Sequence, residues 1–256
     1  MAFRDLFDLT GKVAIVTGGA GTIGRVLTVA LAEFGCDVAV ADLRPQAAAD
    51  LRGAVEGYGR RFLTVGVDVT KPDQVQAMVD QVVRTFGRVD ILINHAGLNI
   101  RKPAVEITES DWDTVLDVNL KGIFLVAQAV GRQMIHQGTG GKIVNTASVS
   151  AVRGHPRLAA YAASKGGIAQ LTRVLANEWA PYRINVNAIG PGYLETDQTR
   201  TYLADPQRRA EILSKIPMGR LGTPEDLVGA VVYLSSPASD YVTGHVLFVE
   251  GGRLID

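Results

Sequence analysis

The sequence predicts an α/β protein whose single domain has a doubly wound parallel sheet of seven strands with helices on both faces. Short apolar runs rich in valine and isoleucine alternate with longer helical patterns from one end of the chain to the other. These runs show little alternation of buried and exposed character, as expected of parallel strands covered on both faces. No linker, repeat or low-complexity stretch divides residues 1–256, so we expect one domain.

Seven runs have the length and composition of buried strands. Helical patterns separate the runs, among them Thr22 to Phe34 and Pro72 to Phe86. In chain order the predicted strands are VAIVT (13–17), DVAVA (37–41), FLTVGV (62–67), DILIN (90–94), KIVNTA (142–147), INVNAI (184–189) and VLFVE (246–250).

The last third of the chain carries a helix start signal and an insertion. In TPED, Thr223 is the expected N-cap, Pro224 the first helical residue and Asp226 the acid that returns to the cap. The segment 192–219 is rich in charge and lacks a strand pattern. We expect it to form a helical flap beside the substrate.

Composition excludes several classes of protein. Acidic and basic residues balance at 26 each, so no net field favours nucleic acid or a membrane surface as a partner. The single cysteine, Cys36, excludes an internal disulfide, and no C-x-x-C or H-E-x-x-H motif suggests a metal site. The start is too charged for a signal peptide, and no apolar run approaches membrane-spanning length. We therefore expect a cytoplasmic protein.

The stretch VTGGAGTIGR, between the first predicted strand and the first helix, fits more than one dinucleotide-binding template. Gly19, Gly21 and Gly24 make G-x-G-x-x-G, whereas Gly18, Gly21 and Gly24 make G-x-x-G-x-x-G. A third spacing, T-G-x-x-x-G-x-G, has Thr22 in place of its middle glycine. Glycines at a strand–helix junction let the backbone approach a pyrophosphate, whose charge faces the free N–H groups of the helix start.

Asp42 ends the second predicted strand, 18 residues beyond Gly24. A carboxylate at this place accepts hydrogen bonds from the hydroxyls of an adenosine ribose and repels a 2′-phosphate. Asp42 therefore favours NAD over NADP. Arg44 is the one contrary sign, because a nearby arginine can hold a 2′-phosphate.

Several residues suggest acid–base chemistry at the carboxyl edge of the sheet. The motif YAASK places Tyr161 and Lys165 four residues apart on one helix face. Ser148, 13 residues upstream, lies at the end of a predicted strand. Asn119 falls in the middle of a predicted helix, where its short amide competes with backbone hydrogen bonds, so we expect a local helix distortion there.

Together these motifs resemble the short-chain dehydrogenase/reductase family, which has the Rossmann fold. The resemblance extends from the strand at Val13 to the terminal VEGG at Val249 to Gly252. The matching marks, in order, are TGGAGTIG, DVT at Asp68, NHAG at Asn94, Asn119, Ser148, YAASK and PG at Pro191.

The family resemblance also chooses among the glycine registers. The Ser148, Tyr161 and Lys165 arrangement is that of short-chain members, so Gly18 and Gly24 should hold the turn. Two residues depart from the family pattern. Thr22 replaces the middle glycine, which is tolerable if Gly21 takes over the permissive backbone role, and His95 replaces the second asparagine of N-N-A-G.

The resemblance implies roles for four catalytic residues. Tyr161 would exchange the substrate's hydroxyl proton, with its pKa lowered by the ammonium of Lys165 and by oxidised nicotinamide. Ser148 would hydrogen-bond the reacting oxygen, Lys165 would hold the nicotinamide ribose, and Asn119 would keep a water in the proton relay.

The resemblance also implies a set of cofactor-binding residues. Asp68 would meet the adenine, Asn94 would support the cofactor, and Thr196 would reach the carboxamide. The complete expected set is Gly18, Gly21, Thr22, Ile23, Gly24, Asp42, Asp68, Val69, Asn94, Ala96, Gly97, Tyr161, Lys165, Pro191, Gly192 and Thr196.

Two segments beside the predicted site are rich in cations. NIRKP contains Arg101 and Lys102, and VRGHPR, between Ser148 and Tyr161, contains Arg153, His155 and Arg157. Arginine is suited to bidentate capture of a carboxylate. We expect Arg101 to be the main substrate contact, with Arg153 and His155 as further candidates, although solvated surface charge is the alternative interpretation.

Three further stretches, GLNIRKPAVEITESDW, AIGPGYLETDQTR and IPMGRLGTPEDL, resemble the gluconate 5-dehydrogenase and 2-deoxy-gluconate dehydrogenase branch. This resemblance implies NAD-dependent oxidation of a secondary hydroxyl on a sugar acid or related polyol. The alternatives are a 3-oxoacyl thioester reductase and a non-catalytic, dinucleotide-binding redox sensor. The family resemblance also implies a homotetramer.

Some histidines and tryptophans require no function. We expect His136 and His245 to be surface or structurally satisfied residues, and Trp112 and Trp179 to be core anchors.

Overall fold

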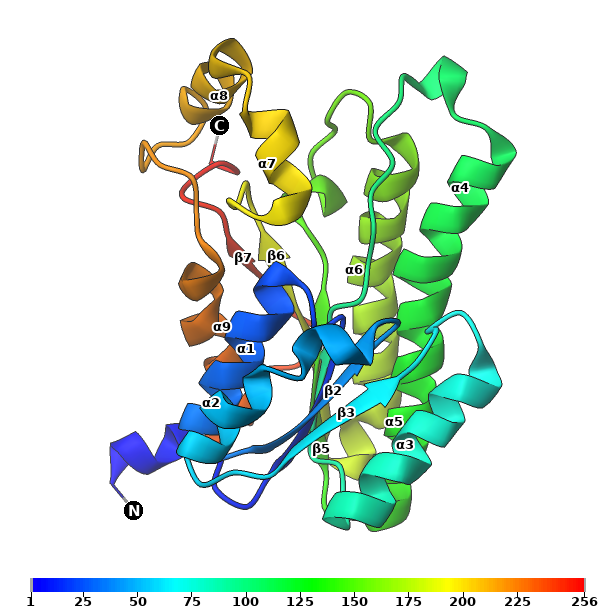
Figure 1. The fold of residues 1–256 in the computed structure, drawn as a ribbon, viewed down its shortest axis with the longest axis vertical. Coiled ribbons are helices and arrows are strands. Elements are labelled where there is room, and N and C mark those ends of the chain that lie inside the picture. The colour runs from blue at the N-terminus through cyan, green and yellow to red at the C-terminus, as the bar shows by residue number, and fades with distance from the viewer. Residues whose placement is uncertain (1, 256) are drawn as a thin grey trace.

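The computed structural model describes residues 2–255 and confirms the predicted fold class. All neighbouring strands pair in parallel, in the order β3-β2-β1-β4-β5-β6-β7 (Figure 1). The strands are β1 (Val13–Thr17), β2 (Asp37–Asp42), β3 (Phe62–Gly66), β4 (Ile91–Asn94), β5 (Gly141–Thr146), β6 (Ile184–Pro191) and β7 (Val246–Val249). Each of the seven predicted strands is present, with ends shifted by at most two residues.

Helices cover both faces of the sheet, and each face has its own apolar core. Figure 1 shows α1, α2 and α9 on one side and α3, α5 and α6 on the other. Two large clusters of buried aliphatic side chains fill the spaces between these helices and the strands. The α-helices are α1 (Thr22–Glu33), α2 (Leu51–Gly57), α3 (Pro72–Phe86), α4 (Glu109–Leu116), α5 (Ile123–Gln137), α6 (Ala159–Trp179), α7 (Asp197–Leu203), α8 (Pro206–Leu213) and α9 (Val228–Ser235).

The strand order reverses direction between β1 and β4, because the chain winds outward from β1 to β3 and then returns to β4. In open parallel sheets, ligands bind in the crevice that such a reversal leaves at the carboxyl ends of the strands. The glycine turn after β1 and the loop after β4 therefore border the expected binding crevice.

A single helical run of 29 residues, Glu109–Gln137, joins α4 to α5 through a π-helical turn, Asp117–Gly122. Within residues 2–255, this run is the one helix long and apolar enough to cross a membrane by length and composition, with mean hydropathy 1.3. The run reaches this length because the π-turn lets two helices continue as one, and it is only weak evidence of a membrane span, since core helices meet the same criterion. Half of the apolar window is buried in the protein, as in many core helices.

The segment expected to be a flap contains α7 and α8 and packs around a small core of its own. Leu203 and Ile212 are buried there against Ile216 and Leu221. After it, the backbone N–H of Thr223 donates to the Asp226 carboxylate at 2.8 Å, as the TPED signal predicts. The helix opens with a 3-10 turn, Pro224–Leu227, before α9 begins.

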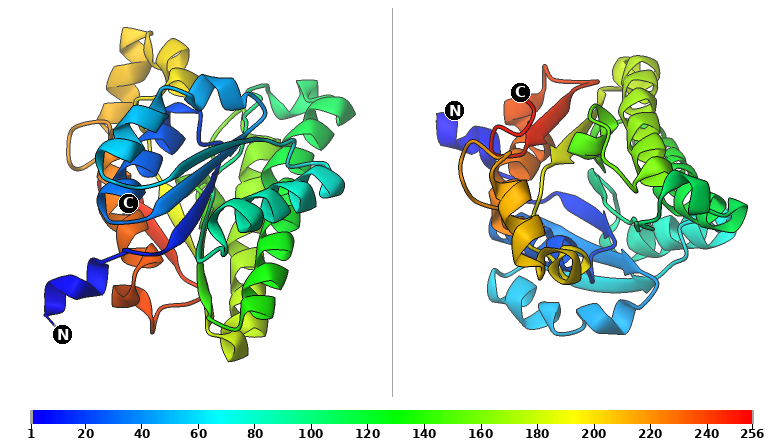
Figure 2. Two further views of the ribbon diagram at one scale, coloured as in Figure 1. Left: turned by 60° about the horizontal axis from the view of Figure 1, so that its bottom comes forward. Right: turned by 90° about the horizontal axis from the view of Figure 1, so that it is seen from above.

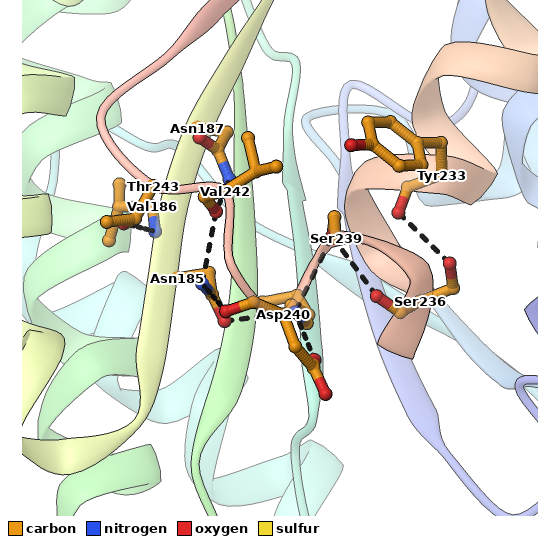
Figure 3. Close-up of polar contacts among 10 residues, drawn as sticks. Asn185, Val186, Asn187, Tyr233, Ser236, Ser239, Asp240, Val242 and Thr243 are labelled. Atoms are coloured by element: carbon orange, nitrogen blue, oxygen red, sulfur yellow. Dashed lines mark hydrogen bonds and ion pairs between the residues drawn. The ribbon is translucent and has the colours of Figure 1, made fainter. Parts of the chain in front are cut away.

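The entry to the last strand is fixed by side-chain amides of β6 (Figure 3). The Asn185 amide donates to the carbonyl oxygens of Asp240 and Val242, both at 3.0 Å. The Asn187 amide donates to the same Val242 carbonyl at 2.8 Å. The Thr243 hydroxyl accepts from the backbone of β6 at 3.1 Å. These bonds set the register of β7 and so the position of the carboxyl-terminal segment that follows it.

The remaining tryptophan and histidine expectations are met in part. Trp179 packs on the core, where its indole lies against Gly131 with no room for a Cβ. Trp112 is 41% exposed, so its prediction as a core anchor was wrong. It lies on α4, which projects beyond the sheet and buries one residue, Val115, among its eight. His136 and His245 are exposed, as expected.

Candidate active site

The turn between β1 and α1 is built on two glycines. Gly18 has φ +67°, and a Cβ there would lie 3.0 Å from the Ala96 backbone in the loop after β4. A Cβ on Gly24 would lie 2.3 Å from the Gly18 carbonyl oxygen. Gly21 adopts an ordinary φ of −77° at the N-cap of α1, so the expected transfer of a permissive role to it was wrong. The turn thus brings bare backbone and a helix N-terminus to the crevice, which fits a pyrophosphate.

Thr22, which stands where the family pattern has a glycine, makes a side-chain contact that glycine could not make. Its hydroxyl donates to the Asp197 carboxylate at 2.7 Å, which joins the first turn of α1 to the first residue of α7. The Thr22 side chain therefore points toward the flap and is accommodated without backbone strain. Ile23 follows it on α1 and packs against the core.

Asp42 ends β2 beside the glycine turn. Its carboxylate accepts from the Ala20 backbone at 3.2 Å and from the Arg44 backbone at 3.0 Å. The carboxylate is therefore held in a fixed orientation at the crevice rim, while the Arg44 side chain is exposed. A carboxylate held in this way at the end of β2 is consistent with a ribose-binding acid. The same two backbone bonds are also consistent with a residue that only caps the loop.

Asn94 and His95 follow one another at the end of β4. The Asn94 amide is fully buried and donates to the Ile123 carbonyl at 2.8 Å and to Asn145 Oδ1 at 3.2 Å. The His95 ring nitrogen Nδ1 is 3.1 Å from the Thr146 hydroxyl. Burial, helped by the charge of Lys165, lowers the pKa of His95 to about 4, so the ring is neutral at physiological pH.

Tyr161, Ser148 and Lys165 converge from two elements at the carboxyl edge of the sheet. Ser148 follows β5 directly, whereas Tyr161 and Lys165 project from α6. Tyr161 and Ser148 line the same cavity, and Ser148 is the neighbour that most favours the ionised phenol. The Lys165 amine lies 5.4 Å from the Tyr161 ring centroid and donates to the Thr146 carbonyl at 2.7 Å. The structure therefore brings together three of the four predicted catalytic side chains.

The buried environment changes the titration of these groups. Burial raises the pKa of Tyr161, and the hydrogen bond with Ser148 and the charge of Arg101 act in the opposite direction. Burial lowers the pKa of Lys165 to about 7. The expected lowering of the tyrosine pKa is thus not found, because desolvation of the phenol outweighs the nearby positive charges. A partly neutral Lys165 also contributes less charge than the sequence suggested.

Asn119, the fourth predicted catalytic residue, is at the centre of the π-helical turn. Its side chain accepts from the Leu98 N–H and donates to the Leu98 carbonyl, both at 2.8 Å. It also donates to the Ser164 hydroxyl on α6 at 3.2 Å. The distortion expected from its position is confirmed, and it lets one amide tie the loop after β4 to the catalytic helix.

The remaining predicted cofactor residues are held by local hydrogen bonds or by close packing. Asp68 accepts from the backbone and hydroxyl of Thr70, which hold its pKa below the usual value. Thr196 caps α7 and is almost completely buried. The other members are buried or close-packed: Val69 against Gly122, Gly97 against Asn119, Pro191 at the end of β6, and Gly192 against Glu250.

A cavity of about 620 Å³ opens beside Tyr161 and Ser148. Its wall includes two of the predicted cations, Arg101 and His155. Arg208, on α8, also lines it and was not predicted. The guanidinium groups of Arg101 and Arg208 lie 4.2 and 4.5 Å from the ring centroid of Tyr202, so two arginines share one aromatic residue of the flap.

The other predicted cations are directed elsewhere. Lys102 pairs with Asp111 at 2.6 Å, and Arg157 is exposed. Arg153 donates to the Arg253 carbonyl oxygen at 2.9 Å and is outside the cavity wall, so the structure does not support its candidate role in substrate binding. In residues 2–255 no cluster of three or more histidine, cysteine or acidic residues is placed to hold a metal.

Comparison with known proteins identifies the class that this fold and site define. A family profile described as enoyl-(acyl carrier protein) reductase matches residues 18–253. Together with the relatives below, this match shows that the chain belongs to the short-chain dehydrogenase/reductase family and is an oxidoreductase.

Several of its relatives are named as enzymes of sugar acids. The chain is 47% identical over 249 residues to the 2-dehydro-3-deoxy-D-gluconate 5-dehydrogenase of Escherichia coli (strain K12), with 97% of each chain covered. It is 39% identical to the gluconate 5-dehydrogenase of Gluconobacter oxydans (strain 621H), with 98% of each covered. A gluconate 5-dehydrogenase from Burkholderia cenocepacia J2315, solved in complex with NADP and tartrate, superposes with a TM-score of 0.94 at 38% identity over 98% of both chains.

Lys165→Met should stabilise the free protein at low pH while abolishing most turnover. The native pKa of about 7 lies below the usual 10.5, so protonation of the buried amine opposes folding. This penalty is complete below pH 7 and disappears as pH rises to 10.5. Since one pKa unit corresponds to about 1.4 kcal/mol, we expect a gain of at least ~2 kcal/mol in unfolding free energy at pH 6.

Urea unfolding of both proteins between pH 6 and pH 10 measures this effect. The wild type should gain stability with pH relative to Lys165→Met, and the two curves should approach each other near pH 10. Parallel curves across the range would show that burial of the charged Lys165 amine does not lower the unfolding free energy of the protein.

Proposed function

We propose that the protein transfers hydride reversibly between a nicotinamide dinucleotide and a secondary hydroxyl or keto group of a sugar acid. The observation that carries this proposal is the cavity in which Tyr161 and Ser148 lie beside Arg101 and Arg208. A proton-exchanging pair on one side and two guanidinium groups on another suit a substrate with both a secondary alcohol and a carboxylate. The names of the relatives support the same substrate class.

The residues of the chain divide the chemistry among them. When bound, the dinucleotide supplies the hydride acceptor or donor. Tyr161 takes the hydroxyl proton during oxidation and returns it during reduction, while Ser148 holds the same oxygen by a hydrogen bond. Lys165 keeps a donor and a partial positive charge beside the phenol and would hold the nicotinamide ribose. Asn119 joins α6 to the loop after β4 through its bonds to Ser164 and Leu98, and it would keep a water of the proton relay in place.

The cofactor sites in the proposed complex follow the crevice. Gly18, Gly24 and the N-terminus of α1 would hold the pyrophosphate. Asp42 would hold the adenosine ribose, Asp68 the adenine and Thr196 the carboxamide. We propose NAD as the preferred cofactor, because a fixed carboxylate at the ribose position repels a 2′-phosphate. A relative solved with NADP shows that the family accommodates the phosphate, so Asp42 requires a direct test.

A 3-oxoacyl thioester reductase is the second candidate, because the chain is also 40% identical over 248 residues to the 3-oxoacyl-(acyl-carrier-protein) reductase of Thermotoga maritima. The cavity argues against it, because two arginines and a histidine line a space that an acyl chain would have to enter. A non-catalytic redox sensor is less consistent with the site, since all four predicted catalytic side chains are present and three of them converge.

Tyr161→Phe should abolish turnover and leave dinucleotide affinity nearly unchanged. The substitution removes the exchangeable proton but keeps the buried ring, and general acid–base catalysis contributes about 10²–10⁴-fold. The assay is formation of NADH from NAD with a panel of sugar acids and polyols, alongside fluorescence titration of NADH. Retention of more than about a tenth of the wild-type rate would exclude Tyr161 as the proton-exchanging group.

Asp42→Ala should reduce the preference for NAD over NADP by at least tenfold. The substitution removes both the ribose acceptor and the charge that repels the 2′-phosphate. The measurement is kcat/KM with each cofactor, for the wild type and the variant. A wild-type ratio that favours NADP would contradict the NAD proposal and direct attention to Arg44.

Arg101→Ala should raise KM for gluconate at least tenfold and change KM for the matching neutral polyol, sorbitol, by less than threefold. A charge-assisted contact to the carboxylate is absent from the polyol, so only the acid should lose affinity. Equal effects on the two substrates would remove the carboxylate assignment. Activity confined to acetoacetyl thioesters would replace the sugar-acid class with the second candidate.

We also propose a cytoplasmic homotetramer. Large apolar side chains are exposed on the long helices, with Phe124 on α5 at 36% and Val174 on α6 at 44%. Such helix faces are suited to pairing by two-fold symmetry. Light scattering at micromolar concentration should give four times the mass of one chain, and a monomer mass would contradict the proposal.

A further inference from the structure

One aromatic side chain of the flap contacts both arginines of the substrate cavity. Tyr202 is on α7, Arg208 is on α8, and Arg101 is in the loop after β4. All three side chains line the cavity. The guanidinium carbons of Arg101 and Arg208 lie 4.2 and 4.5 Å from the Tyr202 ring centroid, within the range of a cation–π contact. Three separate segments of the chain therefore meet at this ring.

The packing of the flap fixes the position of this ring. Leu203, the next residue on α7, is buried in the small apolar core of the flap. At the start of the helix, the Thr22 hydroxyl donates to the Asp197 carboxylate at 2.7 Å, which attaches α7 to the first turn of α1. Figure 2 shows from above that α7 and α8 lie over α1. The Tyr202 ring thus has a set place relative to the turn that we expect to hold the cofactor.

The acidic residues of the flap are engaged with other groups. Glu195 pairs with Arg209, Asp197 with Arg200, and Glu211 with Lys215, while Asp205 caps the start of α8. Arg101 and Arg208 direct two positive charges at one cavity, and the electron-rich face of the Tyr202 ring offsets the repulsion between them. An anion bound in the cavity would offset this repulsion further.

An arginine that is held in place binds an anion more tightly than a flexible one. The side chain of arginine has several rotatable bonds, and ordering them at the moment of binding costs free energy. Stacking on an aromatic ring restrains the guanidinium plane before the ligand arrives. The planar group can then donate to both oxygens of a carboxylate.

We propose that Tyr202 is a positioning residue that holds Arg101 and Arg208 as one clamp for the carboxylate of the sugar acid. The ring acts through the two arginines, and its hydroxyl has no part in this role. Arg101 remains the main carboxylate contact, and Arg208 adds a second guanidinium that the flap carries. The preference for an acid over a neutral polyol therefore depends on the flap as well as on the loop after β4. This inference rests on the proposed sugar-acid substrate.

The test compares Tyr202→Leu and Tyr202→Phe with a matched control, Tyr58→Leu, which removes an exposed tyrosine at the end of α2. Tyr202→Leu keeps an apolar side chain for the core of the flap but removes the aromatic face. It should raise KM for gluconate at least fivefold, with kcat within threefold of wild type and KM for sorbitol nearly unchanged. Tyr202→Phe and Tyr58→Leu should behave as wild type. An unchanged KM for gluconate in Tyr202→Leu, an equal rise for sorbitol, or the same loss in Tyr202→Phe would overturn the proposal.

A cycle of variants separates positioning from a purely structural role of the ring. Residues that act through one another have non-additive effects. Tyr202→Leu should therefore change KM for gluconate by less than twofold in a protein that already carries Arg101→Ala and Arg208→Gln. A further fivefold rise in that protein would show that the ring acts independently of the arginines, and the proposal would be wrong.

Another variant keeps the test informative if Tyr202→Leu does not fold, as judged by circular dichroism and melting. Arg208→Gln leaves the ring in place and should raise KM for gluconate at least threefold without changing KM for sorbitol; no change would overturn the proposal. A wild type that does not prefer gluconate to sorbitol contradicts the sugar-acid function itself. A wild type that prefers gluconate, with a Tyr202→Leu variant that keeps this preference, refutes the positioning role alone.

Discussion

A chain of buried side-chain amides at the centre of the sheet holds the whole site in register. Asn94 donates to Asn145, and Asn145 in turn donates to Thr172 on α6 at 3.0 Å. Because these groups have no access to water, each unmade bond would cost about 1–3 kcal/mol. The chain therefore fixes β4, β5 and α6 relative to one another, and α6 carries Tyr161 and Lys165. The hydrogen bond from Lys165 to Thr146 depends on the same alignment.

The sequence predicted the parts of the structure that local chemistry decides. The strands follow from uninterrupted β-branched runs, which leave little alternative to a buried parallel sheet. The helix distortion at Asn119 follows from the poor fit of a short amide in a helix interior, and the structure shows the contacts that it makes instead. Gly18 and Gly24 were chosen over Gly19 and Gly21 only through the family resemblance. Gly18 and Gly24 have no room for a Cβ, but neither has Gly19, where a Cβ would lie 2.8 Å from the Val40 side chain, so close packing alone does not choose the register.

Residues whose role depends on distant parts of the chain were missed or misplaced. Arg208 lies in a segment with no motif, and only the folding of the flap brings it to the cavity. Lys102 was expected near the substrate, but Asp111 neutralises it nine residues away. The tyrosine pKa was misjudged because the cost of burial depends on the depth of the site, which a motif does not specify.

The free site concentrates electrostatic cost in a protein whose net charge is zero. Lys165 is buried at the expense of its own charge. Among residues 2–255, the buried Nε2 of His155, in the cavity wall, has no hydrogen-bond partner. The cost of burying Lys165 lowers the stability of the free fold, and the ribose contact of the proposed complex would relieve part of it. In that complex the guanidinium groups of Arg101 and Arg208 in the cavity wall would favour an anionic sugar derivative over a neutral polyol or an acyl chain.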